Sequence, residues 1–150
     1  MAELNTEFAD GRDSPGLMLW RVSMQWQALQ RAALRPHELT HVQFVLLAGL
    51  LDLGHPVSQA ELARHMGIDA MMTSQVIRAL ESRNLVVRGR DAQDSRVVKV
   101  EATSAGSELA NAAISDVEAV DREFFGRLGD SQSAFATQLG VLVAGGSIES

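Results

Sequence analysis

Residues 57–86, "VSQAELARHMGIDAMMTSQVIRALESRNLV", decide the fold because they predict two helices with a very short turn between them. Ser58 and Glu61 form a capping-box pattern that begins the first helix, and Gly67 ends it. Asp69 then provides the N-cap of the second helix. Two helices joined by a turn of about three residues are typical of a helix-turn-helix.

The second of these helices has an apolar side and a polar side. Met72, Val76 and Leu80 recur at i, i+4 and i+8 with Ile77 beside them, so they predict the buried side. Each residue turns the helix by about 100°, which places other side chains opposite this stripe. The outer side is therefore expected to carry Ser74 and Arg78, flanked by Ala70, Met71 and Gln75, with Thr73 at an intermediate angle.

These outer side chains suit contact with double-stranded DNA. Arg78 can bond bidentately to guanine, and Gln75 to adenine, in the major groove. The hydroxyl of Ser74 suits a base or a phosphate, and that of Thr73 a phosphate. The alternative is an ordinary polar face that only contacts water.

A β-hairpin is predicted directly after the two helices. "LVVRGR" (85–90) and "RVVKVEA" (96–102) are β-prone segments, joined by the polar turn "DAQDS" (91–95). Asn84 precedes the first segment and tolerates the left-handed backbone often found at a helix end. A helix-turn-helix followed by a hairpin is a winged helix.

Further helices are predicted on both sides of this unit. Residues 17–34 carry two apolar series on nearly opposite faces, which favours coverage of one face by a second subunit. Thr40 and Gln43 form a capping box at the start of another helix. After the hairpin, Thr103 begins a long helix to about residue 128, and a last helix follows from Ser131.

The expected fold is thus mainly helical with a small hairpin wing, and its 150 residues are enough for one domain. We expect an irregular, mobile tail over 1–15 and a domain over 16–146. Within the domain, the winged helix takes up about 40–102, and the dimerisation helices take up about 17–34 and 104–146. The chain has no cysteine, secretion signal or long apolar run, so it is expected to be cytoplasmic, with no membrane contact.

Charge is distributed unevenly along the chain. The net charge of −6 argues at first against a nucleic-acid partner. Residues 64–99, however, hold seven basic and four acidic side chains, a local charge of +3, whereas the rest of the chain carries −9. This asymmetry favours a localised surface that faces an anion, although a solvated charged face gives the same pattern.

"HELTH" at residues 37–41 matches the pattern by which zinc hydrolases present two histidines and a glutamate. Because Thr40 is the predicted N-cap, His37 lies before the helix and His41 lies in its first turn, so the two rings do not share a face. A third ligand, Glu61, is already assigned to a capping box. We therefore expect no metal, cofactor or catalytic activity, and keep a zinc hydrolase as a remote alternative.

Taken together, these segments resemble the MarR family of bacterial transcription regulators over about residues 17–146. Two positions depart from the family pattern, because Asn84 replaces a glycine and Ala102 a leucine, and neither alters the expected fold. The matching pieces are "LTHVQFVLL" (39–47), "SQAELARHMGID" (58–69), "MTSQVIRALESRNLVVR" (72–88), "DSR" (94–96) and "ATSAG" (102–106).

The resemblance implies how the wing would contact DNA. Arg96 matches the arginine that enters the minor groove, and Asp94 matches the aspartate that helps to hold the wing. Ser58 caps its helix and is also a candidate for phosphate contact through the exposed amides there. Further candidates for phosphate contact on the hairpin are Arg88, Arg90 and Lys99.

The resemblance also implies a homodimer on a palindromic operator, acting as a repressor, with release by a small aromatic or phenolic effector. Side chains that could line an effector pocket are Trp20, Met24, Trp26, His41 and Phe44, although such residues are often simply core. A winged helix that binds another protein instead of DNA is the main alternative function.

Overall fold

Residues 4–146 are described by a computed structural model, and they form a mainly helical fold with one antiparallel hairpin, as the sequence predicts. Short 3₁₀ turns connect several of the helices. The elements are η1 (Gly11–Asp13), α1 (Pro15–Leu34), η2 (Arg35–His37), α2 (His41–Leu53), α3 (Gln59–Met66), α4 (Ala70–Ser82), β1 (Val86–Arg90), β2 (Val98–Ala102), α5 (Ser104–Gly126), η3 (Gly129–Ser131) and α6 (Gln132–Gly145).

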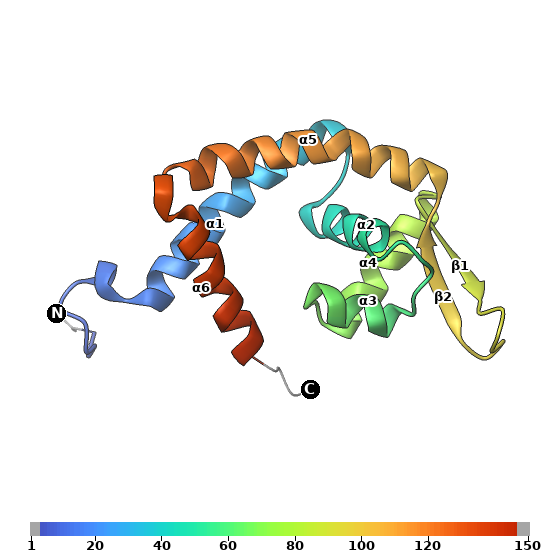
Figure 1. The fold of residues 1–150 in the computed structure, drawn as a ribbon, viewed down its shortest axis with the longest axis horizontal. Coiled ribbons are helices and arrows are strands. Elements are labelled where there is room, and N and C mark those ends of the chain that lie inside the picture. Colours follow the sequence, from blue (N-terminus) through green and yellow to red (C-terminus); the bar gives the residue numbers. More distant parts are fainter. Residues whose placement is uncertain (1–3, 147–150) are drawn as a thin grey trace.

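The elements form two parts that share the long helix α5 (Figure 1). The winged lobe, residues 39–102, consists of α2, α3, α4 and the hairpin, and lies beneath the first half of α5. The terminal arm consists of α1, the second half of α5, and α6. Although α1 and α5 are far apart in sequence, α1 runs along α5 and packs against it. The two ends of the described chain lie at the arm.

The hydrophobic core lies mainly in the winged lobe, where α2, α3, α4, the hairpin and the start of α5 meet, and it extends to Leu34 at the end of α1 and to Val117 in the middle of α5. Full burial of each large aliphatic side chain there contributes about 1.5–3 kcal/mol. In contrast, no residue of α6 is buried. The largest fully buried apolar side chains of the protein are Leu34, Leu46, Leu47, Val57, Leu62, Ile77, Leu80, Val86 and Val100.

The helix starts predicted from capping patterns are confirmed. The Thr40 hydroxyl accepts a hydrogen bond from the Gln43 amide (3.2 Å), and the Thr40 amide donates to the Gln43 side chain (3.1 Å). Ser58 and Glu61 make the same reciprocal pair at 3.1 and 2.7 Å. The Asp69 carboxylate accepts from the Met72 amide at 2.8 Å. Each cap satisfies amides that a helix start would otherwise leave unpaired.

The hairpin is also confirmed, with Val86 opposite Ala102 and Arg90 opposite Val98. Its closing turn is held by a hydrogen bond from the Asp91 amide to the Val97 carbonyl (2.9 Å). Val57 pairs with Val100 through two backbone hydrogen bonds of 3.1 and 2.7 Å. This bridge holds the wing against the segment that leads into α3.

The predicted buried stripe of α4 is wrong in detail. The buried residues are Thr73, Ile77 and Leu80, while Met72 is 45% exposed and Val76 is only partly buried. The hydroxyl of Thr73 donates to the Asp69 carbonyl at 2.9 Å, so its polar atom is satisfied within the helix and the side chain can be buried. The buried face is therefore rotated by less than one residue step from the prediction.

The N-terminal region is more regular than expected. Ser14 accepts a hydrogen bond from the Leu17 amide at 3.3 Å, so α1 begins at Pro15, two residues before the expected start. The 3₁₀ turn η1 lies within the segment expected to be an irregular tail. Residues 1–3 of that segment lie outside the described residues.

The first turn of α5 packs directly on the backbone between α4 and β1. The Thr103 amide donates to the Leu85 carbonyl (3.0 Å), and the Thr103 hydroxyl donates to the Asn84 carbonyl (2.7 Å). Asn84 has a left-handed backbone with φ of 59°, as the sequence predicts. A Cβ on Gly106 would lie 2.0 Å from the Leu85 carbonyl oxygen. Only glycine fits at position 106 without movement of the backbone.

We therefore expect Gly106→Ala to destabilise the protein by about 2–3 kcal/mol, the usual cost of overpacking a tight site. Gly126→Ala is the matched control, because it is in the same helix and no atom lies within 4 Å of its Cβ position. That change should be neutral or stabilise by up to about 1 kcal/mol. Urea unfolding of both variants at one protein concentration measures the difference, and equal effects would contradict the assigned contact.

Candidate nucleic-acid interface

The outer face of α4 is formed by Met71, Gln75 and Arg78, which are all exposed. These residues lie opposite the buried Thr73 and Ile77, because each residue turns the helix by about 100°. Because the buried face differs from the predicted one by less than one residue step, Gln75 and Met71 lie near the centre of the outer face, whereas the sequence placed them on its flanks. Ser74, expected at the centre, lies at the edge and is only partly exposed.

Thr73 is the one predicted contact residue of α4 that the structure contradicts. Its side chain has no exposed surface, and its hydroxyl is already bonded to the Asp69 carbonyl. It therefore cannot reach a phosphate without a change in the helix. The error arose because the stripe of hydrophobic residues indicated the wrong centre for the buried face, and threonine can be buried when its hydroxyl bonds to its own helix.

The wing tip presents Arg96, whose side chain is 89% exposed. Asp94 accepts hydrogen bonds from the backbone amide and from the guanidinium of Arg96, each at 3.1 Å. These bonds lower the pKa of Asp94, so the carboxylate stays charged. The Asp94 carbonyl also accepts from the Val97 amide at 3.0 Å, which closes the turn. The positions of Asp94 and Arg96 at the tip are compatible with the roles implied for them.

Two other basic side chains of the hairpin are paired with carboxylates of the winged lobe. Arg88 donates to Glu81 on α4 at 2.6 Å, and Lys99 donates to Glu61 on α3 at 3.3 Å. Glu61 also accepts from the Ser58 amide, and this bond together with Lys99 lowers its pKa. A DNA phosphate would have to compete with these carboxylates for Arg88 and Lys99.

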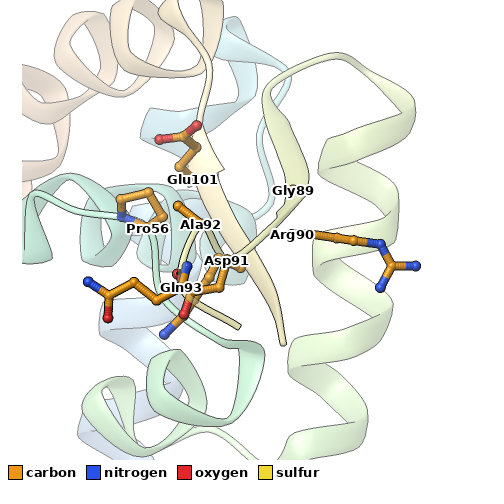
Figure 2. Close-up of a pocket in the computed structure, with 8 residues that line it drawn as sticks. Pro56, Gly89, Arg90, Asp91, Ala92, Gln93 and Glu101 are labelled. Atoms are coloured by element: carbon orange, nitrogen blue, oxygen red, sulfur yellow. Dashed lines mark hydrogen bonds between the residues drawn. The ribbon is translucent and has the colours of Figure 1, made fainter. Parts of the chain in front are cut away.

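The side chain of Arg90, unlike those of Arg88 and Lys99, contacts the turn of the hairpin. Its guanidinium donates to the Ser95 carbonyl at 2.6 Å. Figure 2 shows its side chain pointing away from the other labelled residues, and Arg90 lines a shallow pocket between the wing and Pro56 together with them. That pocket has a volume of about 430 Å³ and is bordered by Gln93 and Glu101. It lies on the side of the hairpin away from the Arg90 guanidinium.

Ser58 is partly buried at the start of α3, where its hydroxyl and its amide both bond to Glu61. The capping role is therefore confirmed. Phosphate contact at this helix start would have to use the neighbouring amides of the first turn, next to a carboxylate that already occupies part of the site.

A buried polar cluster lies where α1 and α5 meet. The Trp26 indole donates to the Asp121 carboxylate at 2.8 Å, and the Gln30 side-chain amide donates to the same oxygen at 2.8 Å. The Gln30 nitrogen also lies 3.4 Å from the Val117 carbonyl. Gln30 has no exposed surface, and its side-chain oxygen has no hydrogen-bond partner. A buried acceptor without a partner in the chain is costly.

The five residues predicted to line an effector pocket are only partly brought together. Trp26 and His41 stack edge to face with ring centroids 5.1 Å apart, close to the polar cluster. Burial lowers the pKa of His41, an effect that Arg31 increases and Asp121 opposes. Phe44 belongs to the core of the winged lobe, whereas Trp20 and Met24 are exposed on α1.

The "HELTH" segment is divided between two elements. His37 ends the 3₁₀ turn η2, before the start of α2 as predicted, and its ring bonds to Asp116 on α5 at 2.7 Å. Glu38 has a left-handed backbone with φ of 54°, which separates η2 from α2. Within residues 4–146, no group of His, Cys, Asp or Glu side chains is placed to hold a metal ion. None of the described helices is long and apolar enough to cross a membrane.

Sequence reasoning missed Gln30, Asp121, Glu81 and the aromatic contact of Trp26 with Phe125 on α5, whose rings are 6.4 Å apart. Gln30 was detectable in principle, because it follows Trp26 by one helical turn and so lies beside the apolar face of α1. Nothing in the sequence relates it to Asp121, which is 91 residues further along the chain.

Comparison with known proteins identifies the family of this chain. The family model described as "MarR family" matches residues 39–98, which correspond to most of the winged lobe. The HTH-type transcriptional regulator YdcH of Bacillus subtilis is 37% identical over 126 residues, which cover 82% of this chain and 86% of YdcH. The chain belongs to the MarR family. It is a DNA-binding transcription regulator and not an enzyme.

Two further proteins are similar to this MarR-family chain. The HTH-type transcriptional repressor Rv2887 of Mycobacterium tuberculosis is 34% identical over 117 residues, covering 77% of this chain and 84% of Rv2887. The solved structure of Bordetella bronchiseptica BpsR, concerned with regulation of DNA binding by 6-hydroxynicotinic acid, superposes with a TM-score of 0.81 and 25% identity. That superposition covers 90% of this chain and 96% of BpsR.

Proposed function

We propose that this protein is a repressor that binds a palindromic operator as a homodimer and is released from it by a small aromatic ligand. The observation that carries the proposal is the outer face of α4, where exposed Gln75 and Arg78 project away from the core. The exposed Arg96 at the wing tip adds a second point of contact. A helix-turn-helix presents its second helix to the major groove in this way.

The proposed contacts are of two kinds, those to the edges of bases and those to phosphates. Arg78 would donate two hydrogen bonds to guanine, and Gln75 would bond to adenine, each worth about 1–3 kcal/mol of discrimination. Arg96 would enter the minor groove, where a narrow groove concentrates negative potential. The side chains proposed to lie near phosphates are those of Ser58, Ser74, Arg88, Arg90 and Lys99.

Dimerisation is supported by apolar side chains that the terminal arm leaves exposed. A single winged helix reads only a few base pairs, so a specific operator normally needs two copies about one helical turn apart. The exposed apolar side chains of α1 and α6 are those of Leu17, Leu19, Trp20, Met24, Leu29, Val141, Leu142 and Val143. A second copy of this chain would bury such surface on a two-fold axis.

Release by an aromatic ligand is supported by the cluster between α1, α2 and α5. Trp26 and His41 offer aromatic surface there, and Gln30 offers an unpaired acceptor. The winged lobe and the terminal arm meet at this place, so a ligand that binds one arrangement of the two parts better would shift the spacing of the α4 helices. The aromatic acid named with BpsR and the repressor name of Rv2887 favour the same proposal.

Alanine substitutions of Arg78 and Arg96 test the DNA-binding mode. We expect Arg78→Ala to weaken binding by about 1–3 kcal/mol and to relax the preference for one base pair. Arg96→Ala should weaken binding more evenly across sequences and reduce the dependence on salt. Titration of both variants against specific and scrambled duplexes at several salt concentrations measures this. Unchanged DNA affinity in both variants would favour a winged helix that binds protein.

The substitution Leu142→Glu tests the dimer. A charge placed in the centre of an apolar interface should raise the dimer dissociation constant about 30-fold or more, and DNA affinity should fall with it. Sedimentation equilibrium measures the association. Ser133→Glu adds the same charge at an exposed polar position of α6 and is the control, because nine residues turn the helix by about 900° and so place Ser133 on the side opposite Leu142. A Leu142→Glu protein that remains dimeric and binds DNA normally would place the interface elsewhere.

A panel of small aromatic acids and phenols, added to the protein–operator complex, tests the effector. We expect at least one compound to lower DNA affinity, and DNA to lower its affinity for the protein by the same factor. Trp26→Phe keeps an aromatic ring but removes the hydrogen bond to Asp121. It should raise the ligand concentration needed for release by up to about tenfold, the value of one hydrogen bond. A panel without effect on DNA affinity contradicts this part of the proposal.

A further inference from the structure

A methionine lies in the centre of the polar outer face of α4. Met71 is 74% exposed, and Met72 beside it is 45% exposed. Most of the other large apolar side chains that are exposed belong to α1 and α6, where a second copy of the chain would cover them. Met71 instead lies on the winged lobe, on the face proposed to meet DNA. Its apolar surface is therefore available to an apolar group of the DNA.

The helix geometry aligns Met71 with the two proposed base readers. Gln75 follows Met71 by four residues and Arg78 follows it by seven, so all three project from one side of α4. Side chains four residues apart have Cβ atoms about 5–6 Å apart, which is less than two base-pair steps. Met71 also lies in the first turn of α4, and the N-terminal residues of a recognition helix are those that contact base edges.

The major groove offers a thioether side chain few favourable contacts. Its base edges present hydrogen-bond donors and acceptors, and its one apolar group is the C5 methyl of thymine. Methionine has no donor and is a weak acceptor, so against a polar edge it would remove water without replacing the lost hydrogen bonds. Against a thymine methyl, both partners lose unfavourable contact with water, and the flexible chain of methionine can adapt to the surface.

We propose that Met71 contacts the C5 methyl of a thymine in each operator half-site and so selects an A·T pair there, an inference that rests on the proposed binding of α4 in the major groove. Gln75, one turn further along, would read adenine in the same pair or in its neighbour. Met72 lies at the side of the outer face and makes no such contact.

Deoxyuridine tests this inference, because it differs from thymidine only by the absence of that methyl. Operator duplexes are first selected from a randomised pool with the full-length protein, and each thymine of one half-site is then replaced in turn. We expect one replacement to lower affinity about fourfold, the effect of exposing one buried methyl group, and about 15-fold when made in both half-sites.

The same replacement is then measured with Met71→Ala and with the matched control Met72→Ala. Loss of the methyl should have no further effect on Met71→Ala but should still lower the affinity of Met72→Ala about fourfold. Circular dichroism checks that both variants keep the helical content of the parent. Because both substitutions are at exposed positions, neither removes a core side chain.

Two negative results are distinguishable. A selected duplex whose affinity is unchanged by uracil at every thymine, or changed equally in the parent and in Met71→Ala, would overturn the inference and leave the proposed function intact. Failure to select any duplex that binds more tightly than random DNA would overturn the proposed function together with the inference.

Discussion

The contact between the first turn of α5 and the backbone of residues 84 and 85 is the constraint on which the rest of the structure depends. Gly106 lets the helix approach the Leu85 carbonyl, and Thr103 bonds to both residues of the junction. The junction joins the end of α4 to the start of β1, while α5 continues into the terminal arm (Figure 1). The orientation of the α4 outer face is therefore tied directly to the helix that continues into the arm proposed to form the dimer. The terminal arm and the α4–β1 junction are thus connected by α5 through packed backbone.

Electrostatics limit how readily the winged lobe binds any polyanion. The whole chain carries a net charge of −6, and the positively charged segment, residues 64–99, consists mainly of α4 and the hairpin. Within that surface, Arg88 and Lys99 are held by Glu81 and Glu61. These carboxylates act as internal counterions, so a phosphate gains less from either cation than from an unpaired one. In the proposed complex with an operator, contacts that depend on base identity would consequently have a larger share of the binding free energy.

The region between the winged lobe and the terminal arm contains an unpaired polar atom next to aromatic side chains. Trp26 and Gln30 share one Asp121 oxygen, while the Gln30 side-chain oxygen is buried without a partner. Such an unsatisfied group costs free energy in the unliganded protein and is recovered when a donor arrives. The aromatic surface of His41 and Trp26 lies beside it. The proposed release by a small ligand therefore rests on the chain's own residues as well as on its relatives.

Local chemistry was enough to predict much of this protein from its sequence. The capping boxes at Thr40 and Ser58 and the left-handed Asn84 follow from residue types a few positions apart, and they define the order of elements that makes a winged helix. The sequence predicted the buried side of α4 only approximately, because a stripe of hydrophobic residues and a threonine that bonds to its own helix compete for its centre. Packing against α2 and α3 decides between them. The sequence could not pair Asp121 with Trp26, or Glu81 with Arg88, because such contacts depend on how distant helices and strands come together. The sequence by itself therefore determined the elements, the fold and the family, whereas the tertiary structure decided which side chains face outward and which charges are already paired.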